Sequence, residues 1–412
     1  MIVLGCIADD FTGATDLANN LVRAGMRVVL SIDVPAEEDR IDADADAVVV
    51  ALKSRTVPAA DAVKLSLDAC RWLRKQGAGQ IYFKICSTFD STAKGNIGPV
   101  IEALMDELGC DFSVATPAFP ENGRTVVHGH LFLGDTLLSD SGMRNHPLTP
   151  MTDANLVRVL QAQMNPSKGR RVGLIDYRTV AQSAEVIRRR MDELKAEGVS
   201  IAIVDALSDE DLSRLGEALR DAPFLTAGSG LGSSLPQNWG FRRASPTTLP
   251  TARGRKAILA GSCSLATNAQ VQRFLQDGGE AYALQPTADL ELQIAKVLAW
   301  ADACWRTEAE LPLLVYSTAE PERVNPANAP LIEQTMAALA RAFVERGVGI
   351  LVVAGGETAG ICVQALGITQ LQIGPQIDPG VPWCYASGLH LALKSGNFGS
   401  PDFFSKAFAF VA

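Results

Sequence analysis

Short, continuous apolar runs alternate with helical patterns along nearly the whole chain, and this alternation most constrains the fold. Residues 2–8 and 47–52 are apolar at almost every position rather than at every second one. Strands of this kind are buried on both faces, as in a parallel sheet covered by helices. The same interpretation applies to residues 81–85, 112–115, 171–175, 201–204, 224–227, 257–260, 311–316 and 349–353.

Helical spacing fills the intervals between these strands. It is clear at 14–24, where Leu17, Leu21 and Val22 share one face. The other predicted helices are 59–76, 97–108, 178–196, 208–221, 265–276, 289–303 and 329–347. Residues 116–150 show neither pattern, and we expect a long, functional loop there.

The chain has 412 residues, more than one hydrophobic core usually serves. A stretch without apolar periodicity begins near Gly240 and predicts an interdomain linker at 241–254. We therefore expect an α/β protein with two Rossmann-like three-layer domains, 1–240 and 255–412. Their sheets should be mainly parallel, with the active site in an interdomain cleft.

Net charge, the length of the apolar runs and the cysteine pattern argue against several classes of protein. The net charge is −9, so the surface should repel a phosphate backbone, and we expect no nucleic-acid partner. No run of 18 apolar residues is present, so no membrane span is expected. The eight cysteines form no C-x-x-C pair, and the opening residues contain no basic leader. These features favour reduced thiols and a cytoplasmic location.

The first strand is followed by Asp9, Asp10 and Thr12 at the start of a helix. Open α/β sheets bind ligands at the carboxyl ends of their strands, and an aspartate there can take a proton from a hydroxyl. The alternative is that Asp10 or Thr12 only caps the helix. Arg55 follows another strand and suits a carboxylate, although a solvated loop base is equally compatible.

Residues 84–96 form the densest polar stretch of the chain. Two lysines, one aspartate, four hydroxyls and a Gly-Asn turn directly follow a predicted strand. Hydroxyls and amides satisfy a polyhydroxylated ligand, and lysines neutralise a carboxylate or phosphate. A hydrophilic turn with helix caps is the alternative, but it rarely needs so many polar groups.

A glycine-rich turn begins at Gly228, after the strand 224–227, and resembles a dinucleotide-binding motif. That motif needs an acidic residue about 20 positions further on to hold the ribose. No Asp or Glu occurs between Ser233 and Gln276. An NAD(P)-dependent oxidoreductase is therefore a distant alternative.

Three polar, glycine-bearing turns lie in the C-terminal half, at 260–264, 354–360 and 394–400. Glycines let backbone N–H groups approach phosphate oxygens, and helix N-termini favour the anion. Three such turns in one domain indicate a nucleotide. No G-x-x-x-x-G-K-[ST] and no H-R-D set occurs, so neither a P-loop enzyme nor a protein kinase is expected.

Together, the turn at 8–14, the stretch 90–96, the Gly355-Gly356-Glu357-Thr358 turn and the 394–399 loop resemble the four-carbon acid sugar kinase family. The resemblance covers essentially the whole chain. It implies an N-terminal acid-sugar domain, a C-terminal ATP domain, and phosphorylation of the terminal hydroxyl of threonate, erythronate or 3-oxo-tetronate.

Within the family, 86–99 and 117–124 look most like the 3-oxo-tetronate kinases. The threonate and erythronate kinases tend to have Leu-Arg where this chain has Ala93-Lys94. The resemblance therefore implies 4-phosphorylation of 3-oxo-tetronate, with D-threonate or D-erythronate as the alternative. A regulator that binds nucleotide and sugar acid without turnover is a further alternative, disfavoured by the retained Asp10, Asp90 and Lys94.

The polar turns and the resemblance together give the expected site residues. Asp10 is the expected base, and ATP and Mg²⁺ are the expected cosubstrate and ion, with metal ligands left unassigned. A homodimer is left open. The residues expected to bind the sugar acid are Asp9, Arg55, Lys84, Asp90, Ser91, Thr92, Lys94, Asn96 and Arg124. Those expected to bind ATP are Ser262, Ser264, Gly355, Gly356, Glu357, Thr358, Gly396 and Gly399.

Overall fold

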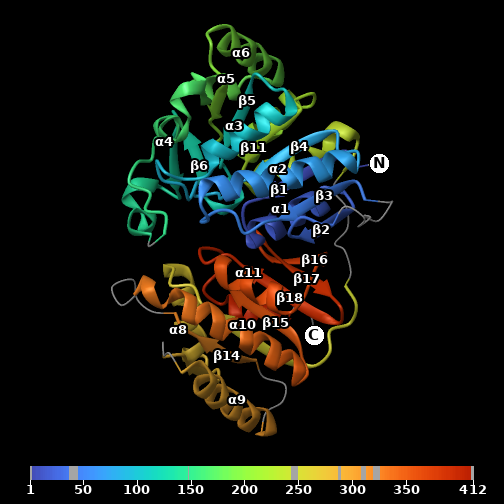
Figure 1. Cartoon of the computed structure of the whole chain (residues 1–412), viewed down its shortest axis with the longest axis vertical. Coiled ribbons are helices and arrows are strands. Elements are labelled where there is room, and N and C mark those ends of the chain that lie inside the picture. Colours follow the sequence, from blue (N-terminus) through green and yellow to red (C-terminus); the bar gives the residue numbers. More distant parts are fainter. Residues whose placement is uncertain are drawn as a thin grey trace. The chain divides into compact units, whose positions relative to one another are not determined.

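The computed structural model describes residues 2–36, 45–146, 148–242, 249–285, 289–307, 312–318 and 325–409. The chain forms two compact units, Met1–Ser245 and Pro246–Ala412 (Figure 1). Part of the expected linker, 243–248, lies outside the described residues. None of the described helices is long and apolar enough to cross a membrane.

The first unit contains a parallel sheet in the order β2-β3-β1-β4-β11-β5-β10-β9. All but the outermost strands β2 and β9 are buried at every residue, which confirms the prediction of strands covered on both faces. The strands are β1 (Leu4–Ala8), β2 (Val28–Ile32), β3 (Ala47–Ala51), β4 (Gln80–Lys84), β5 (Ser113–Thr116), β9 (Val172–Ile175), β10 (Ile201–Val204) and β11 (Phe224–Ala227).

Helices pack along this sheet, with α2 against α3 and α1 against the 3-10 helix η5 (Ser229–Ser233). The α-helices are α1 (Phe11–Arg23), α2 (Ala59–Lys75), α3 (Ile97–Leu108), α4 (Leu156–Gln163), α5 (Tyr177–Val180), α6 (Ala184–Ala196) and α7 (Asp209–Ala218). The single helix predicted at 178–196 was wrong. Ser183 caps a new helix there, because its side chain accepts a hydrogen bond from the N–H of Val186.

The prediction of a long loop at 116–150 was also wrong. An antiparallel sheet occupies much of this stretch, with strands β6 (Arg124–Val127), β7 (His130–Leu133) and β8 (Thr136–Leu137). The connection between β6 and β7 uses positive φ at His128 (51°) and Gly129 (71°). Strands of two to four residues are too short to show a periodic pattern.

The second unit contains a sheet in the order β13-β14-β12-β15-β18-β17-β16. The first five strands are parallel, whereas β17 runs antiparallel to both neighbours. The strands are β12 (Arg255–Ala260), β13 (Ala281–Ala283), β14 (Leu313–Tyr316), β15 (Val348–Ala354), β16 (Gln370–Asp378), β17 (Val381–Ala386) and β18 (Leu389–Lys394).

One hydrophobic core of this unit lies between the sheet and helices α8 and α12. Trp383, Phe403 and Phe404 are among its largest fully buried side chains. The helices are α8 (Leu265–Gln276), α9 (Leu290–Thr307), α10 (Ala329–Glu345), α11 (Gly356–Ala365) and α12 (Phe403–Ala409). This core includes Ala260 of β12, Ala354 of β15 and Ala392 of β18, near the strand ends where the three glycine-bearing turns begin.

Candidate active site

In the first unit, the ends of three neighbouring strands bring the predicted acidic and basic residues together. Strand β1 lies between β3 and β4, and all three run in the same direction. Backbone bonds continue this pairing past the strands: the N–H of Asp9 donates to Lys84 O, and the N–H of Arg55 donates to Asp9 O. The turn at Asp9 and Asp10, Arg55 and the loop after Lys84 therefore share one edge of the sheet.

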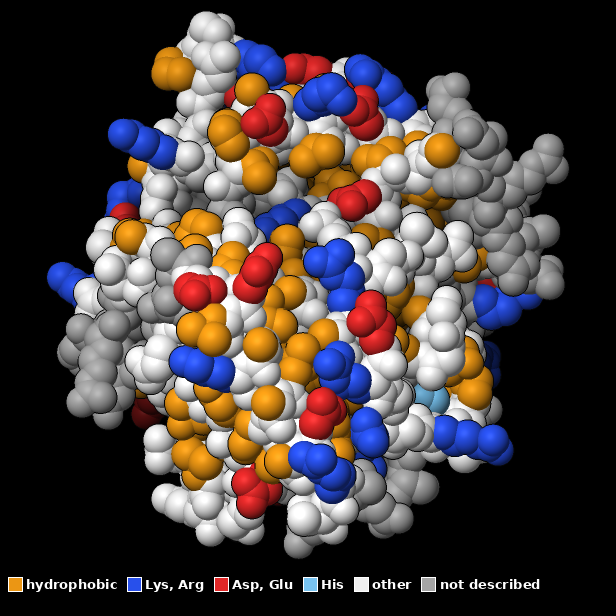
Figure 2. All heavy atoms as spheres, turned by 60° about the horizontal axis from the view of Figure 1, so that its bottom comes forward, with side chains coloured by type: hydrophobic (Ala, Val, Ile, Leu, Met, Phe, Trp, Pro, Cys, Tyr) orange, Lys and Arg blue, Asp and Glu red, His pale blue; other side chains and the backbone are white. Residues whose placement is uncertain are grey.

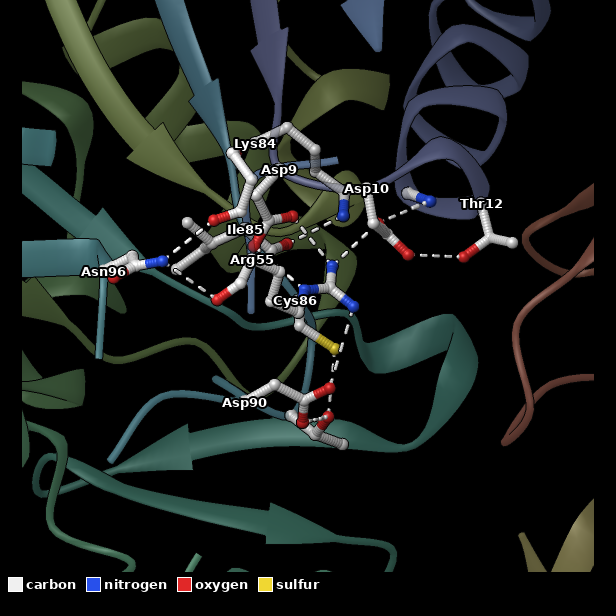
Figure 3. A network of polar contacts seen from close by, with 12 residues as sticks. Asp9, Asp10, Thr12, Arg55, Lys84, Ile85, Cys86, Asp90 and Asn96 are labelled. Carbon is white, nitrogen blue, oxygen red and sulfur yellow. Dashed lines mark hydrogen bonds and ion pairs between the residues drawn. The ribbon is translucent and has the colours of Figure 1, made fainter. Parts of the chain in front are cut away.

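Arg55 is the centre of the polar network at this edge (Figure 3). Its Nε and Nη2 donate to the two carboxylate oxygens of Asp9, at 3.0 and 2.7 Å. Nη2 also donates to Asp10 Oδ1 at 2.7 Å, and Nη1 lies 3.7 Å from Asp90 Oδ2. One guanidinium thus joins three carboxylates from two loops, and its two-pronged edge is occupied by Asp9.

Asp10 is held in place by its own helix as well as by Arg55. Its Oδ1 accepts from the N–H of Gly13 at 2.9 Å, which makes Asp10 the N-cap of α1. Its Oδ2 accepts from the hydroxyl of Thr12 at 2.7 Å. The cap that the sequence left as an alternative is therefore present, and the same carboxylate faces the cationic centre of the site.

The two adjacent aspartates differ in acidity. Burial raises the pKa of Asp9 above its ordinary value, and the charge of Arg55 offsets only part of this effect. Burial also acts on Asp10, but the charges of Arg55 and Lys84 and the bonds from Thr12 and Gly13 outweigh it and lower the pKa. Asp10 is thus ionised at neutral pH.

The buried Lys84 brings a second cation to Asp10. Its Nζ donates to Ile85 O at 2.7 Å. A Cβ atom at Gly13 would lie 2.5 Å from this Nζ and 2.4 Å from Asp10 Oδ1. Only glycine at this position leaves room for the ammonium and the carboxylate beside the first turn of α1.

The loop after β4 presents Asp90 toward Arg55. The hydroxyl of Thr88 donates to Asp90 Oδ1 at 2.5 Å. Phe89, between them, has φ of 62° and a fully buried ring. Positive φ is unfavourable for a bulky residue and is retained where its surroundings enforce it, often at functional sites.

The other predicted sugar-acid contacts are spread around this centre. The amide of Asn96 donates to the carbonyls of Ser54, Arg55 and Val57, at 2.9, 3.1 and 2.8 Å, and so shapes the loop that carries Arg55. Lys94 has an exposed side chain. Arg124 is half-buried, and its Nη1 donates to Asn122 O. Ser91 and Thr92 are bound by Gln163, which the sequence did not single out.

In the second unit, the three glycine-bearing turns also meet at one edge. Strand β15 lies between β12 and β18. The N–H of Ser262 donates to Ala354 O at 3.2 Å, and that of Gly355 donates to Lys394 O at 2.8 Å. The hydroxyl of Ser264, the N-cap of α8, donates to Gly396 O. These bonds connect each turn to the next.

Close packing at these turns depends on the absence of side chains. A Cβ at Gly396 would lie 2.3 Å from the hydroxyl of Ser262. Gly355 has φ of 124°, and a Cβ there would lie 2.9 Å from the hydroxyl of Thr358. Gly356 and Glu357 follow in the first turn of α11. Two helix N-termini and a third loop thus form a surface rich in N–H and hydroxyl groups, suited to phosphates.

The turn at Gly228 serves packing instead. It leads into η5 rather than an α-helix, so it lacks the helix N-terminus that a dinucleotide motif needs. Cβ atoms at Gly228 and Gly230 would lie 2.7 and 2.6 Å from the carbonyls of Pro117 and Ala118. The geometry agrees with the missing acidic residue in arguing against an oxidoreductase.

The comparisons with known proteins agree with this two-part arrangement. A family model described as a sugar-binding N-terminal domain matches residues 4–235. A second, described as a nucleotide-binding C-terminal domain, matches residues 257–404.

Curated relatives match over nearly their whole length. Proteins named 3-oxo-tetronate kinase from Pseudomonas savastanoi pv. phaseolicola and Burkholderia multivorans are each 54% identical, over 98% of this chain and 96% of the relative. The protein of the same name from Haemophilus influenzae is 43% identical, over 98% and 99%. A solved structure from Salmonella typhimurium LT2 has a TM-score of 0.84 at 43% identity and covers 99% of both chains.

Proposed function

The chain belongs to the four-carbon acid sugar kinase family, and we propose that it transfers the γ-phosphoryl group of ATP to the 4-hydroxyl of 3-oxo-tetronate. The observation that carries this proposal is the identity of 52–54% with several curated 3-oxo-tetronate kinases over nearly the full chain. We also expect a cytoplasmic location.

The first unit supplies the groups for the sugar acid. We propose that Asp10 receives the proton of the 4-hydroxyl as the new P–O bond forms. Its pKa is below the ordinary value, so it is ionised at neutral pH, and in the described network its Oδ2 accepts one hydrogen bond, from Thr12. Phosphoryl transfer depends mainly on positioning and charge stabilisation, so a carboxylate of ordinary or low basicity can serve.

Arg55 fixes the direction of both aspartates, and we propose that its Nη1, beside Asp90, faces the substrate. Lys94, which is exposed, is the proposed partner for the substrate carboxylate. Asp90, Ser91 and Thr92 are proposed to bind the substrate hydroxyls.

The second unit supplies the groups for ATP. We propose that the N-termini of α8 and α11 and the loop 395–400 bind the phosphates, with Ser262, Ser264 and Thr358 as hydroxyl donors. Mg²⁺ is proposed to accompany the nucleotide, since charge between the β- and γ-phosphates must be neutralised.

The described residues fit an ion that the nucleotide carries. They contain no group of three or more His, Cys, Asp or Glu side chains arranged to hold a metal. Mg²⁺ is commonly bound by one or two carboxylates together with substrate phosphates and water. Glu357 is the carboxylate among the residues proposed for ATP, and we propose it as the protein's contribution.

We propose no nucleic-acid partner. On the face shown in Figure 2, basic and acidic side chains are interspersed, so this face offers no continuous basic surface for a phosphate backbone. The net charge of −9 also disfavours binding to a phosphate backbone.

A homodimer is the oligomeric state to test, and a sedimentation measurement on the purified protein tests it.

An ATP-consumption screen of the purified protein tests the proposal. The substrates are 3-oxo-tetronate, D-threonate and D-erythronate, each with Mg²⁺. We expect turnover with the 3-oxo acid. Turnover with threonate or erythronate alone would move the protein to the alternative within the family, and ATP binding without turnover on any acid would support the regulator.

A further inference from the structure

In the loop that follows β18, most carbonyl groups accept hydrogen bonds from two fully buried side chains, Lys394 and Gln270. The ammonium of Lys394 donates to the carbonyls of residues 395, 396 and 398, at 2.9, 3.2 and 3.2 Å. The amide Nε2 of Gln270, from α8, lies 3.0, 3.0 and 3.1 Å from the carbonyls of residues 398, 399 and 400. Both side chains have 0% exposure.

This arrangement determines where the N–H groups of the loop point. In a trans peptide, the C=O and N–H of one unit point in opposite directions. The unit between Gly399 and Ser400 shows the result, since its carbonyl faces Gln270 and its N–H donates to Asp378 Oδ2 at 2.9 Å. One N–H of the loop therefore already binds an anionic oxygen.

Two further N–H groups of the loop belong to Gly396 and Gly399. In the described part of the chain, the N–H groups of Gly396 and Gly399 donate to no protein acceptor. Each belongs to a peptide unit whose carbonyl is bound by Lys394 or Gln270. Neighbouring N–H groups turned to one side form a concave site for an anion.

We infer that Lys394 and Gln270 are positioning residues for the nucleotide: they bind the carbonyls of loop 395–400 so that the N–H groups of Gly396 and Gly399 receive phosphate oxygens. The inference rests on the proposed function, because it takes ATP as the ligand. Neither side chain reaches the nucleotide, because both are fully buried beneath the loop.

The chemistry of Lys394 argues against a purely structural role. Its ammonium is bound by a hydroxyl, Thr267 Oγ1 at 3.0 Å, and by carbonyls, with no ion pair in the described residues. Burial lowers its pKa to about 7. A buried charge without a counter-ion is unfavourable. A phosphate across the loop supplies the missing negative charge.

The first unit provides a matched counterpart. Gln163, from α4, donates through Nε2 to Ser91 Oγ at 2.8 Å and Thr92 O at 2.7 Å, and its Oε1 accepts from the N–H of Gly98. It therefore shapes the loop proposed for the sugar acid as Gln270 shapes the loop proposed for ATP. The two glutamines should affect different substrates.

Substitution of Gln270 by Glu is the test. The side chain keeps its size, but an oxygen then faces three carbonyl oxygens, so the loop loses its anchor. We expect the KM for ATP, and the Kd for ATP measured without sugar acid, to rise about tenfold or more, with the KM for 3-oxo-tetronate within twofold of wild type. Lys394→Met should behave in the same way. Gln163→Glu should instead raise the KM for the sugar acid alone.

The control for lost stability is Gln80→Glu. Gln80 is also buried and also donates to two carbonyls, those of Leu219 and Ala222, away from either proposed ligand loop. Both KM values should stay at wild type, whatever the change in melting temperature. Folded Gln270→Glu or Lys394→Met protein with an unchanged Kd for ATP would overturn the inference.

Hydrogen–deuterium exchange of the wild-type protein decides the case if the variants do not fold. ATP should slow exchange of the amides of Gly396 and Gly399, and unchanged exchange at saturating ATP would overturn the inference. Wild-type protein that shows this protection but no turnover of 3-oxo-tetronate would leave the loop assignment standing and remove the proposed substrate.

Discussion

The guanidinium of Arg55 holds both carboxylate oxygens of Asp9, with Nε 3.0 Å from Oδ2 and Nη2 2.7 Å from Oδ1. Both oxygens of Asp9 are therefore bound by Arg55, whereas Asp10 accepts from Arg55 through Oδ1 alone. This difference between two adjacent aspartates is the basis for assigning the proton transfer to Asp10.

Asp10→Asn should lower kcat by roughly 10²–10⁴, the usual contribution of a general base. Asparagine caps a helix about as well as aspartate, so the melting temperature and the KM for ATP should change little. Steady-state kinetics with both substrates varied, together with a thermal melt, measure this. A raised KM for the sugar acid with kcat intact would mean that Asp10 only orients the substrate.

Asp9→Asn is the control for Asp10. It loses the two-pronged pairing with Arg55 and should mainly affect stability and the KM for the sugar acid. Near-normal turnover in Asp10→Asn alongside an inactive Asp9→Asn would identify Asp9 as the base.

Arg55→Ala leaves Asp9 and Asp10 buried without their main cation. Removing one partner of a buried pair costs about 3–5 kcal/mol, so the free energy of unfolding should fall clearly. The KM for the sugar acid should rise far more than the KM for ATP. Arg55→Lys restores the charge but not the two-pronged contact and should recover only part of both losses. Wild-type stability and kinetics in Arg55→Ala would show that its contacts with Asp9 and Asp10 contribute to neither folding nor substrate binding.

Gly355→Ala should weaken ATP binding. The added Cβ meets Thr358 Oγ1 at 2.9 Å and Ser262 N at 3.2 Å, and the φ of 124° is unfavourable for alanine. Gly367→Ala is the matched control, since Gly367 also has positive φ (66°) but open space around its Cβ position. Calorimetry should show a raised Kd for ATP in Gly355→Ala only. A wild-type Kd for ATP in Gly355→Ala as well would show that the turn at Gly355 does not contact the nucleotide.

The buried Asp16 of α1 predicts a pH-dependent stability. Burial raises its pKa to about 7 in the folded state, so the folded protein binds the proton more tightly than the unfolded chain. The stability that goes with its protonated form is therefore fully present below the unfolded pKa of 3.8. It is lost as the pH rises from there to about 7. Asp16→Asn removes this loss of about 4 kcal/mol in the free energy of unfolding.

Thermal melts at pH 5 and pH 8 test this directly. The gain in melting temperature from Asp16→Asn should be larger at pH 8 than at pH 5. The same difference at both values would show that the carboxyl of Asp16 does not titrate in this range.

The sequence predicted the parts of the fold that local patterns determine. Strands buried on both faces are continuous apolar runs, so β1, β3 and β4 were identified, and their shared direction explains why Asp9, Arg55 and Asp90 lie at one edge. The antiparallel strands β16 and β17 were missed. Burial is interrupted along β16, and its pairing with β17 contains register shifts, so no clean period is present.

The supporting residues of the site were not predictable in this way. Gln270 and Gln163 each use an amide on a helix to bind a loop far away in sequence, at a separation of 128 residues for Gln270 and Phe398. A glutamine in a helix gives no local sign of such a partner. The one available signal for Gln270 was its place on the buried face of α8, with Thr267 and Val271.

The most direct test of the account compares kcat/KM for 3-oxo-tetronate, D-threonate and D-erythronate at saturating ATP and Mg²⁺, with the product identified by ³¹P NMR. The account predicts a 4-phosphate and a kcat/KM at least tenfold higher for the 3-oxo acid, a difference of about 1.4 kcal/mol in transition-state binding. Equal or higher kcat/KM for threonate or erythronate, or a phosphate on another oxygen, would contradict it.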